Sequence, residues 1–226
     1  MSRAYLQPEE VGRLEEATAY LRDRLLIRLL FRLGCRVSEA LGIAVDDIDF
    51  NQGTATIEHL KTRVKLSCPD CGTRLSQTAR FCPGCGHGVA KAVAEEKERR
   101  RQRSLPMDKE TLDMLRGYIA RGGPVAANGK CLLFGLSRSH AWKIVRDCAE
   151  KAGLGYLVNP ETGELRGISP HRLRDAFAIN AVKHDDSGDG LRKLQEHLGH
   201  QSITTTMRYR KISGEEQKEW YQKLWE

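Results

Sequence analysis

The chain has 226 residues, and its 37 Lys and Arg outnumber its 30 Asp and Glu, giving a net charge of +7. This length is ample for a hydrophobic core and fits one large domain or two small ones. No apolar run reaches the roughly 20 residues that span a bilayer, and no signal peptide is visible, so we expect a cytoplasmic protein without a membrane partner. The positive balance favours a polyanionic partner.

The N-terminal part of the chain predicts helices. Residues 21–33 are rich in leucine and indicate a central helix that Gly34 ends. Ser38 is predicted to cap the short helix that follows, which leaves Arg36 at the start of that helix. Taken alone, Arg36 would be interpreted as a surface arginine or as the ion-pair partner of Glu39.

A change of pattern after this region predicts a β-hairpin. Residues 51–53 form an Asn-Gln-Gly turn signal, and the β-type run 54–57 follows. We expect the return strand near residues 101–106, before a helix over residues 108–121. Residues 66–90 therefore form an insertion between the two strands.

Four of the seven cysteines lie in this insertion as two Cys-x-x-Cys pairs. They are Cys68, Cys71, Cys82 and Cys85. Each pair can place two thiolates on one metal, so both together predict a tetrahedral zinc ribbon. Disulfides are not expected in a cytoplasmic protein, and the adjacent His87 is interpreted as a surface histidine. The remaining three are expected to be small buried side chains: Cys35, Cys131 and Cys148.

Two basic features follow the insertion. The run at residues 95–103, EEKERRRQR, contains the first group of candidate phosphate contacts, Arg99, Arg100 and Arg101. A solvated strand or helix end is an equally open interpretation. A helix predicted from residue 138 to about 151 would bury Ala141, Trp142, Val145 and Ala149. Its other face carries the second candidate group: Arg138, Ser139, Lys143 and Arg146.

The C-terminal part combines side chains suited to phosphodiester chemistry. His171 and Arg174 are three residues apart and share a helical face, and Tyr209 follows His200 by nine residues. A tyrosine can act as a nucleophile, an arginine can hold two phosphate oxygens, and histidines can move protons near neutral pH. The set could attack a phosphodiester without a metal.

The local signals around these residues predict their supporting structure. Gly199 indicates the end of a helix, and Ser202 is expected to cap the next one. Residues 188–190, Gly-Asp-Gly, predict a loop that gives Tyr209 mobility, and residues 156–167 a turn or short hairpin. Residues 213–226 predict a helix whose tryptophans pack either on their own domain or on a neighbouring protomer.

These motifs resemble the catalytic domain of the tyrosine recombinase (phage integrase) family. They are Gly-x-Arg-x-Ser-Glu-x-Leu at 34–41, Lys-Thr at 61–62, Pro-His-x-Leu-Arg-x-x-Phe-Ala at 170–178 and Leu-Gly-His-x-Ser-Ile-x-Thr-Thr-x-x-Tyr at 198–209. They occur in the order found in the family, and the resemblance covers nearly the whole chain outside the insertion. Together they are far more specific than any one of them.

The resemblance implies a fold and a catalytic set. The expected fold is α+β and mainly helical, with a small antiparallel sheet and an inserted zinc ribbon of four cysteines at 66–90. Residues 1–226 would form the catalytic domain, without the N-terminal core-binding domain that clamps DNA in the family. The implied catalytic residues are Arg36, Lys61, His171, Arg174, His200 and Tyr209. Lys65 is the alternative to Lys61. Asp175 replaces a histidine common in the family and is expected to leave this set untouched.

The activity implied by the resemblance is site-specific DNA recombination through a 3′-phosphotyrosyl intermediate. It needs no ATP and no catalytic metal, acts on double-stranded DNA in a homo-oligomer, a tetramer, and would place the protein at the nucleoid. The resemblance also places the helix at 138–151 against DNA. The alternatives are a strand-swivelling enzyme like the type IB topoisomerases, a non-catalytic DNA-binding regulator derived from a recombinase, or a zinc-ribbon adaptor protein.

Overall fold

The computed structural model describes residues 4–76, 78–89, 93–127, 129–159, 162–210 and 221–225, with side chains except at 59–65 and 93–101. It divides into a helical unit, residues 1–57 with 103–226, and a smaller unit, residues 58–102. The helices are α1 (Pro8–Glu16), α2 (Leu21–Arg32), α3 (Val37–Leu41), α4 (Lys109–Ala120), α5 (Arg138–Lys151), α6 (Pro170–His184), α7 (Gly188–Leu198), α8 (Ile203–Met207) and the 3-10 turns η1 (Val45–Asp47) and η2 (Arg208–Arg210). The strands are β1 (Ile48–Asp49), β2 (Thr54–Ser67), β3 (Arg74–Leu75), β4 (Val93–Pro106), β5 (Val125–Ala127), β6 (Lys130–Leu132), β7 (Leu157–Val158) and β8 (Leu165–Arg166).

Helix α2 lies at the centre of the helical unit. Its residues from Leu25 to Phe31 are all buried, and it packs against α1, α4 and α6. Arg28 is tolerated in this apolar run because its guanidinium donates to the Glu15 carboxylate and the Thr111 hydroxyl, both at 2.9 Å. These bonds satisfy a charge that would otherwise be costly to bury.

The predicted central helix is confirmed, but the predicted cap of the next helix is wrong. Helix α3 begins at Val37, so Arg36 and not Ser38 is its N-cap residue. The Arg36 backbone N–H donates to the Glu39 carboxylate at 2.8 Å. A glutamate at the third helical position thus supplies the capping bond and fixes Arg36 at the helix start.

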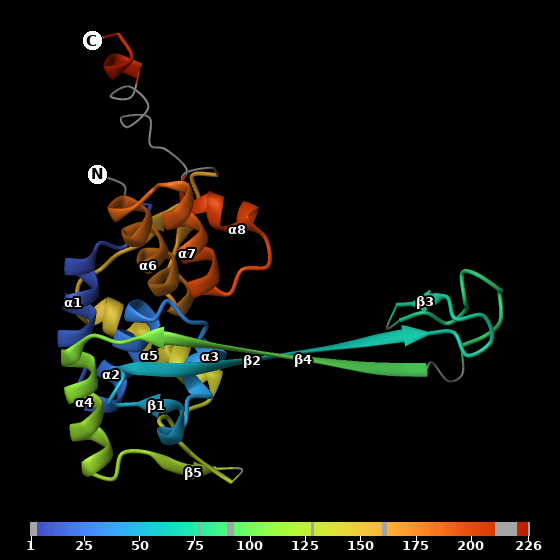
Figure 1. The fold of residues 1–226 in the computed structure, drawn as a ribbon, viewed down its shortest axis with the longest axis horizontal. Helices are drawn as coiled ribbons and strands as arrows, with labels where there is room; N and C mark the ends of the chain where they lie inside the picture. The colour runs from blue at the N-terminus through green and yellow to red at the C-terminus, as the bar shows by residue number, and fades with distance from the viewer. Residues whose placement is uncertain are drawn as a thin grey trace. The chain divides into compact units, whose positions relative to one another are not determined.

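The strands form three small antiparallel sheets. Strand β1 pairs with β2 in the register Ile48↔Ala55, and β4 pairs with β2 on its other side (Figure 1). The return strand was correctly placed before α4 but begins at Val93, earlier than expected. Strands β5 and β6 form one further hairpin, and β7 and β8 form the one predicted within residues 156–167. The mainly helical α+β architecture is confirmed.

The C-terminal helices α6 and α7, which lie together in Figure 1, build a second hydrophobic cluster. Tyr209 packs against this cluster. The predicted loop at residues 188–190 is wrong, because these residues form the first turn of α7 and the Ser187 hydroxyl accepts the Gly190 N–H. Gly199 ends α7, as predicted, and its φ of 67° is that of a left-handed cap. Ser202 caps α8 by accepting the Thr204 N–H, also as predicted.

Helix α5 differs from its prediction at one apolar position. Ala141, Val145 and Ala149 are buried, but Trp142 is 44% exposed and Ile144 is buried in its place. A helical face follows positions three and four apart, which favours Ile144 over Trp142. Cys148 is buried as predicted, whereas the prediction for Cys131 is wrong because it is exposed.

Two further predictions concern the C-terminal segment and membranes. Most of the helix predicted over residues 213–226 lies outside the described residues, and within 221–225 the Trp225 side chain is 75% exposed. In the part of the chain that the structure describes, no helix combines the length and apolarity needed to cross a membrane.

Candidate active site and cysteine cluster

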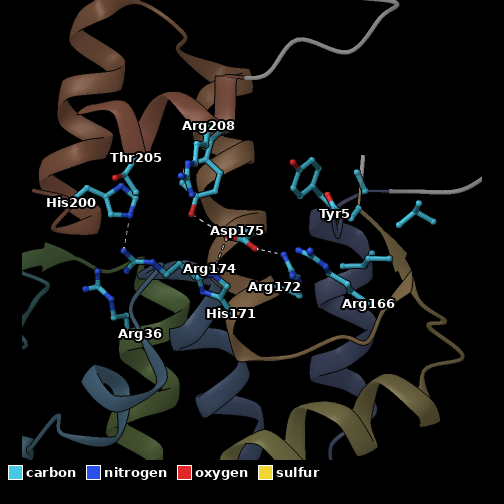
Figure 2. Close-up of a pocket in the computed structure, with 15 residues that line it drawn as sticks. Tyr5, Arg36, Arg166, His171, Arg172, Arg174, Asp175, His200, Thr205 and Arg208 are labelled. Carbon is cyan, nitrogen blue, oxygen red and sulfur yellow. Dashed lines mark hydrogen bonds and ion pairs between the residues drawn. The ribbon is translucent and has the colours of Figure 1, made fainter. Parts of the chain in front are cut away.

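A cavity of about 570 Å³ collects five of the six predicted catalytic side chains (Figure 2). They come from the start of α3, from α6, from the turn after α7 and from η2: Arg36, His171, Arg174, His200 and Tyr209. The sixth, Lys61, lies on β2, where its side chain is outside the described ones, as is that of Lys65.

Arg174 forms the buried floor of this cavity. Its side chain is 2% exposed and donates to the carbonyl oxygens of Gly34 at 2.6 Å and Leu198 at 2.8 Å. Burial lowers the pKa of Arg174, and the neighbouring Arg36 charge lowers it further. The two backbone bonds fix the guanidinium plane, so it is preorganised to receive an anion.

Glu39 holds the second arginine beside the first. Its carboxylate accepts from Arg36 Nη1 at 2.9 Å and from Arg103 Nη2 at 2.8 Å. Burial alone would raise the pKa of Glu39, but the bonds from Arg103 and from the Arg36 backbone lower it to about 2. Arg36 remains partly exposed, so part of its guanidinium faces the cavity.

His200 is held as a neutral ring in a defined tautomer. Its Nε2 lies 3.2 Å from Arg174 Nη2, and its Nδ1 lies 2.9 Å from the Thr206 hydroxyl. An arginine only donates, so Nε2 accepts and Nδ1 carries the proton. Burial, followed by the positive charge of Arg174, lowers the pKa of His200 to about 4.

Tyr209 lies over His200 and points its hydroxyl to a carboxylate. The two rings stack with centroids 6.2 Å apart, and Tyr209 Oη donates to Asp175 Oδ1 at 3.1 Å. Burial raises the pKa of Tyr209, and the negative charge of Asp175 raises it further. The phenol is therefore protonated at rest and needs a proton acceptor before it can attack.

His171 lies at the mouth of the cavity rather than on its floor. Its side chain is 65% exposed, and its Nε2 is 3.9 Å from Asp175 Oδ1. His171 and Arg174 were predicted to share a helical face, and both line the same cavity, at different depths (Figure 2).

Three side chains that organise this site were not predicted from the sequence. Glu39 and Arg103 were not assigned to it. Asp175 was expected only to leave the catalytic set untouched, and the structure adds that it bonds Tyr209 directly. A signal was available for Glu39, which belongs to the Gly-x-Arg-x-Ser-Glu motif. Arg103 pairs with Glu39 from a position 64 residues away, which no local pattern indicates.

The four cysteines of the smaller unit lie close together, as their spacing predicts. Their sulfur atoms all lie within 4.8 Å of one another, with Cys71 to Cys82 at 3.5 Å and Cys68 to Cys85 at 3.7 Å. A disulfide requires about 2.05 Å, so none is formed between these pairs. Four thiols in this arrangement could hold a metal ion.

Both Cys-x-x-Cys segments fold in the same way. Cys68 O accepts the Gly72 N–H and Cys82 O accepts the Gly86 N–H, both at 2.9 Å. The two glycines have φ of 72° and 73°, which side chains rarely adopt. His87 is exposed, as predicted, with Nδ1 3.2 Å from a carboxylate oxygen of Asp70.

The residues predicted to contact DNA divide into two groups. The basic face of α5 is exposed along its length: Arg138, Ser139, Lys143 and Arg146. Arg99, Arg100 and Arg101 lie on β4, where their side chains are outside the described ones.

The chain is similar to known proteins. The model of the phage integrase family matches residues 4–80 and 84–216. Tyrosine recombinase XerD of Mycobacterium tuberculosis (strain CDC 1551 / Oshkosh) is 29% identical over 198 residues, which are 84% of this chain and 47% of that protein. XerD of Neisseria meningitidis serogroup B is 31% identical over 201 residues, covering 85% of this chain and 51% of the relative.

Solved structures share the fold. The crystal structure of XerA recombinase superposes with a TM-score of 0.64 at 21% identity, covering 98% of this chain and 64% of that one. XerH site-specific recombinase, solved with its difH substrate after cleavage, gives a TM-score of 0.61 at 21% identity, covering 100% and 54%. The chain spans about half the length of the curated relatives it matches. On the family match over most of its length, the chain belongs to the phage integrase family.

Proposed function

We propose that this chain cleaves and rejoins double-stranded DNA as the catalytic domain of a site-specific tyrosine recombinase. The observation that carries the proposal is the single cavity shared by two arginines, two histidines and one tyrosine. Relatives named tyrosine recombinases support it, as does the structural similarity to XerH with its cleaved DNA.

In the proposed reaction, the Tyr209 oxygen attacks a scissile phosphate. A bond forms between this oxygen and phosphorus, the bond to the 5′-oxygen breaks, and a 3′-phosphotyrosyl linkage and a 5′-hydroxyl result. The linkage retains the energy of the phosphodiester, so rejoining requires no ATP. A 5′-hydroxyl of the partner duplex then attacks the linkage and releases Tyr209.

The remaining side chains would stabilise the transition state and move protons. Arg36 and Arg174 would hold the non-bridging oxygens, because both guanidinium groups line the cavity and Arg174 is fixed by backbone carbonyls. His200 would hydrogen-bond the phosphate once Nε2 carries a proton in place of its contact with Arg174. His171 would assist proton transfer from the rim. Lys61 would donate the proton that the leaving 5′-oxygen takes. Together these groups would make a catalytic metal unnecessary.

We further propose that residues 66–90 form a zinc ribbon inserted in the catalytic domain of residues 1–226. Zinc is bound at about 2.3 Å from sulfur, so a tetrahedral site has sulfur atoms about 3.8 Å apart. The cysteine pairs at 3.5 and 3.7 Å fit this spacing. The Gly84 N–H donates to Cys82 Sγ at 3.3 Å, a bond that stabilises a thiolate ligand.

The wider contacts with DNA and with other protomers belong to the same proposal. The exposed basic face of α5 and the arginines at 99–101 would neutralise phosphates of the DNA backbone. Exchange between two duplexes needs four active sites, so the proposed assembly is a tetramer on DNA at the nucleoid.

The nucleophile provides the test of this function. Tyr209→Phe removes only the attacking oxygen, so we expect DNA binding to persist and the covalent adduct on a nicked suicide duplex to disappear in a denaturing gel. Tyr221→Phe, which changes an exposed tyrosine outside the cavity, is the matched control and should form the adduct at the wild-type rate. An adduct in the first variant and none in the second would transfer the role to Tyr221.

A further inference from the structure

Asp175 occupies the side of the cavity on which the Tyr209 oxygen lies. Its side chain is 8% exposed, and its two oxygens have different partners. Oδ1 accepts from Tyr209 Oη at 3.1 Å, and Oδ2 accepts from Arg172 Nη1 at 2.8 Å. Arg172 thus fixes the carboxylate from one side and leaves the other oxygen directed at the phenol.

The attack by Tyr209 requires a base at this position. A phosphodiester is attacked efficiently by a phenolate, and burial next to a carboxylate keeps the resting phenol protonated. The proton must therefore leave as the new bond forms, to an acceptor within hydrogen-bond distance of Oη. Asp175 Oδ1 is the acceptor that the structure gives this hydroxyl.

The two histidines of the cavity are less suited to this role. The Nε2 lone pair of His200 already accepts a hydrogen bond from Arg174, and its Nδ1–H already donates one to the Thr206 hydroxyl. His171 Nε2 lies 3.9 Å from the same Asp175 oxygen, and its side chain is 65% exposed. The phenol donates to the carboxylate at 3.1 Å, so His171 would receive this proton only after Asp175.

We propose that Asp175 is the catalytic base that accepts the phenol proton of Tyr209 during cleavage, with Arg172 as its positioning residue. The inference rests on the proposed function. As the bond between the Tyr209 oxygen and phosphorus forms, the phenol proton moves to Asp175 Oδ1. The departing 5′-oxygen takes its own proton from the proposed acid, Lys61. In rejoining, the protonated Asp175 returns the proton to the departing Tyr209 oxygen, so the enzyme ends each cycle unchanged.

Four side chains from three parts of the chain face Asp175. His171 and Arg172 face it from its own helix α6, Tyr209 from η2, and Tyr5 from the segment before α1. Arg172 is a permanent cation bonded to Oδ2 at 2.8 Å, so the carboxylate keeps a positive partner next to the oxygen that faces the phenol. Figure 2 shows the Asp175 carboxylate joined to Arg172 by a dashed line.

The experiment follows adduct formation on a nicked suicide duplex by Asp175→Asn, which keeps the shape of the side chain and removes the basic oxygen. We expect single-turnover cleavage at pH 7 to fall by about 100-fold, because a general base contributes 10²-fold or more. The cleavage rate that remains in Asp175→Asn should rise with pH, because hydroxide then accepts the phenol proton. The wild-type cleavage rate should not change over the same pH range.

A second substrate distinguishes the loss of the catalytic base from the loss of the catalytic acid. A 5′-bridging phosphorothiolate has a leaving group that needs no proton, so it restores cleavage to a variant that lacks the acid but not to one that lacks the base. We expect no rescue of Asp175→Asn. The proposal would be overturned if the phosphorothiolate restored cleavage by Asp175→Asn. It would also be overturned if this variant cleaved the ordinary duplex within threefold of the wild-type rate, or faster because the tyrosine is no longer restrained.

Controls keep this test separate from that of the function itself. Adduct formation by wild type and its loss in Tyr209→Phe report on the proposed function, whatever the result at position 175. Should Asp175→Asn not fold by circular dichroism, Asp175→Glu carries the test. It retains a carboxylate, so cleavage should be slower with the flat pH profile preserved. A rate that rises with pH in the glutamate variant would contradict the assignment.

Discussion

Glu39 is the residue that makes the positive charge of the site compatible with a folded core. Its side chain is 1% exposed and accepts from Arg36 and Arg103, while Arg174 Nη1 lies 4.0 Å away. A buried anion among three guanidinium groups lowers their mutual repulsion while leaving Arg36 and Arg174 facing the cavity. Glu39 therefore links the stability of the domain to the geometry of its phosphate-binding groups.

Glu39→Gln should destabilise the protein by about 3 kcal/mol at pH 7, because it leaves buried arginines without their counter-charge. Urea unfolding measures the change. Glu164→Gln, which removes one partner of an exposed pair with Arg166 at 3.3 Å, is the control and should change the free energy of unfolding by less than about 1 kcal/mol. Equal midpoints for Glu39→Gln and wild type would contradict the buried-network interpretation.

The same residue predicts an acid-sensitive stability. The pKa of Glu39 lies at about 2 in the folded chain against an ordinary value of 4.5, so protons bind more tightly to the unfolded state. The contribution of Glu39 to stability is therefore complete above pH 4.5 and is lost as the pH falls from 4.5 toward 2. Glu39→Gln should lack this part of the pH profile in urea unfolding measured over that range.

At the scale of elements, the two Cys-x-x-Cys turns belong to a different structural unit from the helices. All helices of the described residues belong to the unit formed by 1–57 and 103–226, whereas the four cysteines belong to residues 58–102. The described apolar cluster in that smaller unit is built on Cys68, Leu75 and Cys82. So small a cluster is a weak source of stability without a bound metal.

Purified protein should therefore contain about one zinc per chain, measured by elemental analysis. Cys82→Ser should lose the metal and increase proteolysis within residues 66–90, while the helical circular dichroism stays within a few per cent of wild type. Cys131→Ser is the control, because Cys131 is exposed and lies outside the cluster, and it should keep the zinc. Stoichiometric iron would keep the site and change its chemistry; absence of any metal would refute it.

At the scale of the whole molecule, the excess positive charge determines how DNA binding responds to salt. The net charge is +7, and the basic face of α5 adds exposed cations to those of the cavity. Each neutralised phosphate releases counterions, so affinity falls steeply as salt increases. The slope of this dependence counts the phosphates that the chain contacts.

Replacing Arg99, Arg100 and Arg101 with alanine should reduce that slope by up to about 2.7, which corresponds to three contacts at about 0.9 each. Fluorescence anisotropy between 50 and 300 mM salt on one duplex measures it. A charge-matched control replaces three exposed arginines outside the cavity: Arg13, Arg116 and Arg192. Equal slopes for wild type and the triple variant would show that the side chains at 99–101 face solvent and do not contact DNA.

Local order was accessible from the sequence because it depends on neighbours along the chain. The leucine-rich helix α2, the helix end at Gly199 and the Ser202 cap were all predicted correctly. The spacing of Cys68 and Cys71 was also sufficient, since a Cys-x-x-Cys turn positions both sulfurs by itself. These features follow from hydrogen bonds and side-chain periods that extend over only a few residues.

The motifs also identified five of the residues that line the cavity, but not how they are connected. Tyr209 reaches Asp175 across 34 residues, and Arg103 reaches Glu39 across 64. Such pairs depend on how the helices pack, because a charge selects its partner by distance in space and by the burial of both groups. The exposure of Trp142 and of Cys131 was decided in the same way, since a helix or strand offers several apolar residues and packing buries only some of them.

The sequence by itself therefore determined the family, the helices and the identity of the reactive groups, all of which are written in short-range patterns. The tertiary structure alone decided that Glu39 neutralises the arginines, that His200 is neutral, and that Asp175 accepts a hydrogen bond from the Tyr209 hydroxyl. The physical reason is that ionisation and hydrogen bonding respond to the total local field and solvent exposure, which exist only once distant segments have packed together.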